Sequence, residues 1–145
     1  RNAEGIRALG DRVVVKVPAT RDGFAAASAL VRDGATVLVT AVYSVAQALV
    51  CASIGAQYIA PYLGRMRDAG IDGDAVIARM QGMCAGSDSN VLAASLRSPD
   101  DITGLRLAGV PYFTAAPDVI EQMLFHGVSD SSAAEFDAAM VRLGA

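Results

Sequence analysis

The sequence predicts an α/β fold, and within that class an incomplete (β/α)8 barrel. Apolar runs typical of buried strands alternate with alanine-rich stretches typical of helices, and turn-forming residues fall regularly between them. Strands that alternate with helices pair in parallel through right-handed crossovers, which gives either an open doubly wound sheet or a barrel. The chain has 145 residues, whereas a complete barrel takes roughly 200 to 250. We therefore expect a single domain over residues 1–145 that forms part of a barrel.

Each strand is expected where a short apolar run lies between turn signals. The five runs cover residues 12–18, 36–42, 57–61, 90–95 and 112–115. Helices are expected to follow them, at about residues 24–33, 44–55, 72–82, 99–109, 117–126 and 132–143. The polar segment from Gly64 to Gly73 is predicted to be a loop. Ser44 and Ser98 each precede a helical stretch and are suited to cap its N-terminus.

Polar side chains lie at or just beyond the carboxyl ends of the expected strands. Barrel enzymes collect their catalytic groups at that end, so this distribution favours a barrel over an open sheet. The segment 64–70 lacks the glycine spacing of a phosphate loop or a dinucleotide fingerprint, which disfavours nucleotide binding. The polar residues in question are Lys16, Thr40, Tyr62, Ser95 and Arg97, with Arg65 in the loop after Tyr62.

Composition excludes several other classes of protein. The net charge is −3 and no block of like charges occurs, so nothing favours nucleic acid. No apolar run approaches the roughly 18 residues of a membrane span, and we expect no membrane partner. Cys51 and Cys84 are not in a CxxC pair and His126 has no ligand-type neighbours in sequence, so a zinc site is not expected and both thiols are predicted to be free.

Lys16 is the only lysine of the chain, and it lies inside the apolar run from Val13 to Pro18. A lysine ammonium buried among valines is costly to desolvate, so such a side chain tends to lose its proton and become a nucleophilic amine. A neutral lysine on a barrel strand indicates Schiff-base chemistry. The alternative is an edge-strand lysine whose ammonium reaches water along the aliphatic stem. The spacing alone leaves both interpretations open.

Four segments in order resemble the transaldolase family, and most closely its small fructose-6-phosphate aldolase-like branch. The resemblance runs from about residue 10 to residue 130. Jointly these motifs are specific, whereas singly only the lysine strand and the APY-x-x-R segment are distinctive. The segments are residues 14–20, residues 40–44 with 46–48, residues 58–62 with Arg65, and residues 91–95 with Arg97.

The resemblance implies a (β/α)8 barrel with the Schiff-base lysine on its fourth strand. The five strands expected here would then be family strands four to eight, followed by the C-terminal helix. The chain begins at Arg1 with neither a methionine nor a signal-type stretch, so we expect an N-terminally truncated sequence. By the resemblance, the first three strands would carry an aspartate and a further acid or amide that help to protonate and position the reacting oxygen.

The resemblance also implies class I aldol chemistry that needs no metal or other cofactor. Lys16 would attack a ketose carbonyl, and the resulting iminium would act as the electron sink for carbon–carbon cleavage. Thr40 matches a family threonine near the lysine nitrogen, although on its own it would be an ordinary strand residue. Tyr62 matches a position that is tyrosine in fructose-6-phosphate aldolases and typically phenylalanine in transaldolases, which favours aldol cleavage. Tyr43 is expected only to pack.

Arg65 and Ser95 match family positions that bind the substrate phosphate, and Arg97 is close to them in sequence. An arginine fork and a serine hydroxyl are suited to that role. Arg67 and Asp68 are expected to be solvated surface residues. The helix start at residues 98–101 carries two adjacent aspartates that would repel an anion, so it is interpreted as a cap.

The expected function is therefore a class I aldolase acting on a phosphorylated ketose, cleaving fructose 6-phosphate to dihydroxyacetone and glyceraldehyde 3-phosphate. One alternative is a transaldolase that transfers a dihydroxyacetone unit in the pentose phosphate pathway. The other is a catalytically incompetent barrel fragment, because five strands leave open sheet edges. The resemblance suggests a cytoplasmic homo-oligomer in which the helix at 132–143 reaches a neighbouring subunit.

Overall fold

Five parallel strands form the centre of the structure, and they are arranged side by side in the order of the chain. A doubly wound sheet would break that order at a switch point, whereas a barrel keeps it. The sheet is therefore an arc of a (β/α)8 barrel, as the sequence predicts. The computed structural model describes residues 2–10 and 12–144. Its strands are β1 (Val15–Pro18), β2 (Val37–Val42), β3 (Tyr58–Pro61), β4 (Asn90–Leu96) and β5 (Tyr112–Ala115).

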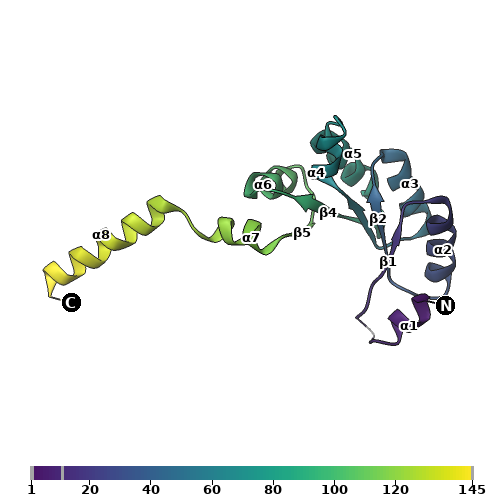
Figure 1. The fold of residues 1–145 in the computed structure, drawn as a ribbon, viewed down its shortest axis with the longest axis horizontal. Helices are drawn as coiled ribbons and strands as arrows, with labels where there is room; N and C mark the ends of the chain where they lie inside the picture. The colour runs from purple at the N-terminus through teal and green to yellow at the C-terminus, as the bar shows by residue number, and fades with distance from the viewer. Residues whose placement is uncertain (1, 11, 145) are drawn as a thin grey trace.

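Helices follow every strand, and most of them cover one face of the arc. Helices α2, α3 and α5 lie side by side along that face, whereas α7 and α8 extend away from the sheet (Figure 1). Helix α8 contributes no buried residue. The helices are α1 (Asn2–Arg7), α2 (Arg21–Arg32), α3 (Val45–Ile54), α4 (Leu63–Asp68), α5 (Gly73–Cys84), α6 (Pro99–Leu107), α7 (Pro117–Leu124) and α8 (Gly127–Leu143).

The core lies between the sheet and these helices. Val39, Ile59 and Val91 are in register on three neighbouring strands, and each is completely buried. Burial of such a side chain stabilises the fold by about 1.5 to 3 kcal/mol. Because side chains alternate along a strand, the residues just before them point to the other face. On that inner face Lys16 is exposed and Leu38 is half-buried.

Polar caps fix where several helices begin, and those at Ser44 and Ser98 are at predicted positions. The Thr20 and Ser44 hydroxyls accept hydrogen bonds from backbone N–H groups of α2 and α3. Ser98 forms a reciprocal capping box with Asp101 at the start of α6. The interpretation of residues 98–101 as a cap is therefore confirmed. Each such cap contributes on the order of 1 kcal/mol.

Several boundaries differ from the sequence prediction. The predicted loop from Gly64 is wrong in its first part, because residues Leu63–Asp68 form helix α4. Its two apolar anchors, Leu63 and Met66, are buried one turn apart, but six residues are too few to give a periodic signal.

Helix α8 begins at Gly127 instead of residue 132, and the His126 ring nitrogen accepts a hydrogen bond from the Val128 N–H at its start. Strand β1 begins at Val15 instead of residue 12, and α1 was not predicted.

In the part of the chain that the structure describes, no helix has the length and apolar character needed to cross a bilayer.

Candidate active site

Irregular backbone marks the carboxyl ends of two strands of the sheet. Ala41 on β2 and Ser95 on β4 have positive φ angles of 57° and 58°, a conformation that costs about 1 kcal/mol or more outside glycine. The register of each strand shifts at the same place, between Thr40 and Val42 and between Ala93 and Leu96. Such bulges redirect side chains at the rims of barrels.

Tyr62 is the centre of the cluster at this end of the sheet. Its phenol oxygen accepts a 2.8 Å hydrogen bond from the Thr40 hydroxyl. The Arg65 guanidinium lies 4.7 Å from the centroid of the Tyr62 ring, and the Lys16 ammonium lies 6.0 Å from it. Tyr43 packs edge-on against the same ring with centroids 6.2 Å apart, which agrees with its expected packing role. Side chains from β1, from the end of β2 and from the segment after β3 thus surround one phenol.

This environment lowers the pKa of the Tyr62 phenol below its ordinary value. The hydrogen bond from Thr40 is the largest cause, because it stabilises the phenolate. Partial burial opposes the shift, while the positive charges of Lys16 and Arg65 add to it. The phenol is therefore a stronger acid than an ordinary tyrosine, which suits it to proton transfer.

Arg65 and Ser95 line a hollow of about 460 Å³ beside Tyr62. The hollow holds one guanidinium, two hydroxyl groups from Ser95 and Thr114, and the phenol. A cation with neutral donors is a suitable chemical environment for a phosphate group. Of its polar residues, Thr114 on β5 was missed by the sequence prediction, because an isolated threonine on a short strand carries no distinguishing signal. The other lining residues are Ala94, Leu96, Ala115 and Ala116.

Gly64 brings helix α4 against the end of β4. A Cβ atom at this position would lie 2.6 Å from Nε of Arg97 and 2.7 Å from the carbonyl oxygen of Ser95. Atoms cannot approach so closely, so only glycine permits this packing without displacing a neighbour. The approach places Arg65, the next residue of α4, beside the strand end that carries Ser95.

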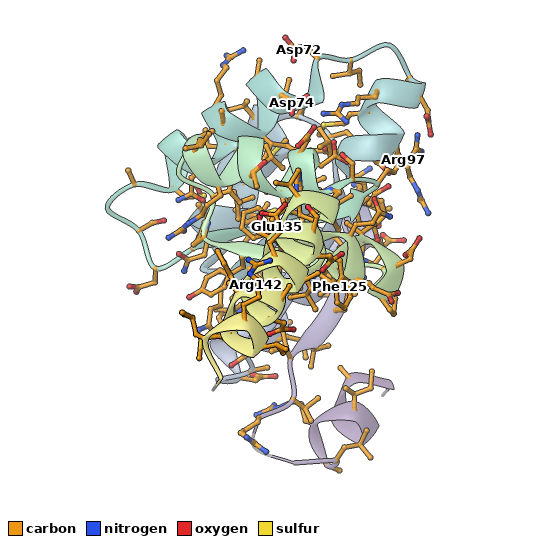
Figure 2. All side chains as sticks on the ribbon, turned by 90° about the vertical axis from the view of Figure 1, so that its left-hand side faces the viewer. Asp72, Asp74, Arg97, Phe125, Glu135 and Arg142 are labelled. Carbon is orange, nitrogen blue, oxygen red and sulfur yellow. The ribbon has the colours of Figure 1, made fainter. Side chains whose placement is uncertain are left out.

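Arg97 is not among the residues that line the hollow with Arg65 and Ser95. Its guanidinium forms a two-pronged ion pair with Asp68 on α4, with N···O distances of 2.8 and 2.5 Å. Figure 2 shows the side chain at the margin of the body, extending outward. Asp68 is exposed, as expected of a solvated surface residue, but it also pairs with Arg97. The pKa of Asp68 is lowered by the hydrogen bonds from Arg97.

Lys16 is exposed, so the predicted burial among valines is wrong. Val15 and Val17 point toward α2 and the core, while Lys16 points to the inner face of a strand at the edge of the sheet. The edge-strand alternative describes its surroundings better. Its ammonium still lies on the same side of the sheet as Tyr62.

Arg67 is exposed, as the sequence indicates, but it is also held by two carboxylates. It binds Asp101 at 2.6 Å and Asp74 at 2.9 Å, so one guanidinium joins three helices. No local pattern could have revealed this network, because Arg67 and Asp101 are 34 residues apart.

The chain matches a known protein family over nearly its whole length. The family described as Transaldolase/Fructose-6-phosphate aldolase matches residues 1–144. A probable transaldolase of Hyphomonas neptunium is 36% identical over 146 aligned residues, which cover 99% of this chain and 68% of the relative. A probable transaldolase of Chelativorans sp. is 34% identical, with 99% and 67% covered. The chain thus spans about two thirds of the length of these relatives.

Among solved structures, mandelate oxidase with (S)-2-phenylpropionate superposes with a TM-score of 0.53 at 19% identity, over 63% of this chain and 28% of the other. This likeness concerns the fold alone. The names of the sequence relatives favour the transaldolase alternative over the expected fructose-6-phosphate aldolase.

Proposed function

The chain belongs to the transaldolase/fructose-6-phosphate aldolase family, and we propose that Lys16 forms a Schiff base with a phosphorylated ketose. The Lys16 amine attacks the ketose carbonyl, and water leaves to give an iminium. Cleavage of the bond between the carbons α and β to the iminium carbon passes its electron pair to the iminium. An aldehyde phosphate departs, and a three-carbon enamine stays on the lysine.

The convergence of three side chains on Tyr62 carries this proposal. Thr40 holds the phenol oxygen, Lys16 lies beside the ring, and Arg65 contacts the ring and lines the hollow beside it. The reacting carbon would lie near Lys16 and Tyr62, and the phosphate near Arg65 and Ser95. Tyr62 would then receive or return the proton of the hydroxyl from which the aldehyde forms.

We propose that the enamine is passed to an aldehyde acceptor, so that the protein is a transaldolase. The names of the relatives support transfer. The second candidate is aldol cleavage, in which the enamine is protonated and water releases free dihydroxyacetone. The acidic Tyr62 phenol supports this candidate, because it can supply that proton.

Arg97 would join the phosphate site only if its guanidinium exchanges Asp68 for the substrate. Its present ion pair leaves Arg65 and Ser95 as the residues that we propose for the first contact with phosphate. Substitution of Arg65 should therefore weaken phosphate binding more than substitution of Arg97.

We propose further that the protein is a cytoplasmic homo-oligomer. Helix α8 extends from the body with Phe136, Met140 and Val141 exposed (Figure 1). A second subunit could cover these side chains. Sedimentation tests this: Phe136→Glu should shift the protein toward the monomer, whereas Glu135→Gln on the same helix should not. A monomer before any substitution would contradict the proposal.

Borohydride trapping tests the Schiff base. Reduction in the presence of dihydroxyacetone or fructose 6-phosphate should attach the sugar to Lys16, the only lysine of the chain. Lys16→Arg keeps the charge but cannot act as a nucleophile, so it should abolish trapping while the fold persists. A peptide map with label at the amino terminus and none on Lys16 would refute the assignment.

A further inference from the structure

One arginine outside the proposed site connects three helices. Arg67 on α4 donates to both carboxylate oxygens of Asp74 at the start of α5, at 3.1 and 2.9 Å. Its other terminal nitrogen donates to Asp101 on α6 at 2.6 Å. The bidentate contact and the short contact together fix the orientation of the planar guanidinium. We call Arg67 and Asp101 the clamp.

Asp101 extends the clamp to the end of strand β4. The residue is 4% exposed, and its second oxygen accepts hydrogen bonds from the backbone N–H groups of Arg97 at 2.7 Å and Ser98 at 3.2 Å. Burial alone would raise the pKa of this carboxyl group, but the hydrogen bonds from Arg97 and Arg67 hold that pKa below its ordinary value. A buried carboxylate with this many donors has a tightly defined position.

The clamp joins the two segments that supply Arg65 and Ser95 to the hollow beside Tyr62. Arg67 follows Arg65 by two residues on α4, and the N–H groups bound by Asp101 follow Ser95 by two and three residues. Gly64 sets how closely these segments approach. The clamp sets how α4 is oriented against the strand end, and thereby the separation of the Arg65 guanidinium from the Ser95 hydroxyl.

We propose that Arg67 is a positioning residue that sets the affinity of the hollow for the phosphate group of the substrate. It acts through Asp101 and the backbone of Arg97 and need not touch the substrate. The inference rests on the proposed function, because it takes the hollow beside Tyr62 as the phosphate site. It adds a device, built from Arg67 and Asp101, that the chemistry at Lys16 does not require.

Calorimetry with fructose 6-phosphate and fructose measures the contribution of the phosphate directly. Arg67→Met should weaken binding of fructose 6-phosphate about tenfold, the order of effect seen when supporting residues are removed from a binding site, while binding of fructose stays unchanged. Arg67→Lys should restore binding in part, since an ammonium can pair with Asp101 but cannot also hold Asp74 as a fork. Arg79→Met, on the exposed side of α5, removes the same charge and should have no effect.

The outcomes separate this inference from the proposed function. Equal binding of fructose 6-phosphate by the Arg67→Met variant and the parent would overturn the inference, and so would an equal loss of affinity for both sugars, which indicates general loosening. Failure of the parent to bind fructose 6-phosphate would overturn it as well. Trapping on Lys16 is scored separately with dihydroxyacetone, which lacks phosphate, so a failure of the lysine chemistry is recognised independently. If Arg67→Met unfolds, the double variant Arg67→Met/Asp101→Asn leaves no buried unpaired charge and permits the same measurement.

Discussion

The hydroxyl of Thr40 donates a hydrogen bond to the phenol oxygen of Tyr62, with 2.8 Å between the two oxygen atoms. Thr40 is on β2 and is 9% exposed, and Tyr62 follows β3. The two residues are brought together because neighbouring parallel strands end at the same edge of the sheet. The donor direction is important, since a hydroxyl that donates to a phenol stabilises the phenolate more than the neutral phenol.

Removal of this donor should make Tyr62 a weaker acid. In Thr40→Val the pKa of Tyr62 should rise toward its ordinary value of 10.0, because the hydrogen bond from Thr40 is the largest cause of the lowering. Ultraviolet titration of tyrosinate, with Tyr62→Phe subtracted, isolates this phenol from the other three. Thr40→Ser keeps the hydroxyl, so the titration midpoint of Tyr62 should stay lowered in this variant.

The same shift predicts how stability depends on pH. An acid whose folded pKa is depressed stabilises the fold above its unfolded pKa, and that contribution disappears as pH falls through the folded pKa. Thr40→Val should therefore lose extra stability only in alkaline solution, near and above pH 10. If Thr40→Val lost equal stability at neutral and alkaline pH, the loss would come from altered packing and not from the pKa of Tyr62.

Tyr62→Phe tests whether the phenol takes part in the chemistry. The substitution keeps the ring against Arg65 and Tyr43 but removes the proton donor. Release of free dihydroxyacetone should fall by about 100-fold, the lower range for loss of a general acid or base. Transfer to an aldehyde acceptor should fall less, because the acceptor replaces the proton in capturing the enamine.

Tyr43→Phe is the matched control, since Tyr43 packs on the same ring from the neighbouring strand end. Its ratio of cleavage to transfer should equal that of the parent. An unchanged ratio in Tyr62→Phe would make Tyr62 a packing residue and leave the choice between the two activities open.

Local pattern was sufficient to predict the strands and the end of the sheet where polar residues gather. Short apolar runs between turn signals predict β2 and β4. Because parallel strands end at the same edge of the sheet, Thr40 and Tyr62 were expected to lie near each other. The hydrogen bond between them is a detail of side-chain geometry that spacing does not determine.

The errors arose where distant partners decide the structure. The exposure of Lys16 depends on which face of the sheet is covered, which its valine neighbours do not indicate. Arg67 and Asp68 have the composition of a solvated turn, but Asp101 and Arg97 lie on other elements and pair with them. Helix α4 is too short to be recognised from periodicity.

The two cysteines should be unreactive in the native state. Burial raises the pKa of Cys51 to about 12 and also raises that of Cys84, so both are protonated thiols at neutral pH. A disulfide reagent at pH 8 should label neither in the folded protein and both in denaturant. Because the folded state favours the protonated thiols, stability should decline as the solution becomes alkaline enough to ionise cysteine in the unfolded chain. Rapid native labelling of Cys51 would contradict its burial on the core-facing side of α3.

Gly64→Ala should disturb the site through the close approach of α4 to β4. The added Cβ would meet Nε of Arg97 at 2.6 Å and the Ser95 carbonyl oxygen at 2.7 Å, and the carbonyl belongs to backbone that cannot turn aside. We expect a loss of about 1 to 3 kcal/mol in the free energy of unfolding.

Gly82→Ala makes the same chemical change in the last turn of a helix but in open space. Gly82 lies on α5, and a Cβ there meets nothing within 4 Å. Alanine is the better helix former by about 0.5 to 1 kcal/mol, so this variant should be more stable than the parent. Urea unfolding of both variants shows whether each substitution lowers or raises the free energy of unfolding. Two effects of the same sign would show that α4 can move away from β4 at little cost, and that the separation of Arg65 from Ser95 is set by other contacts.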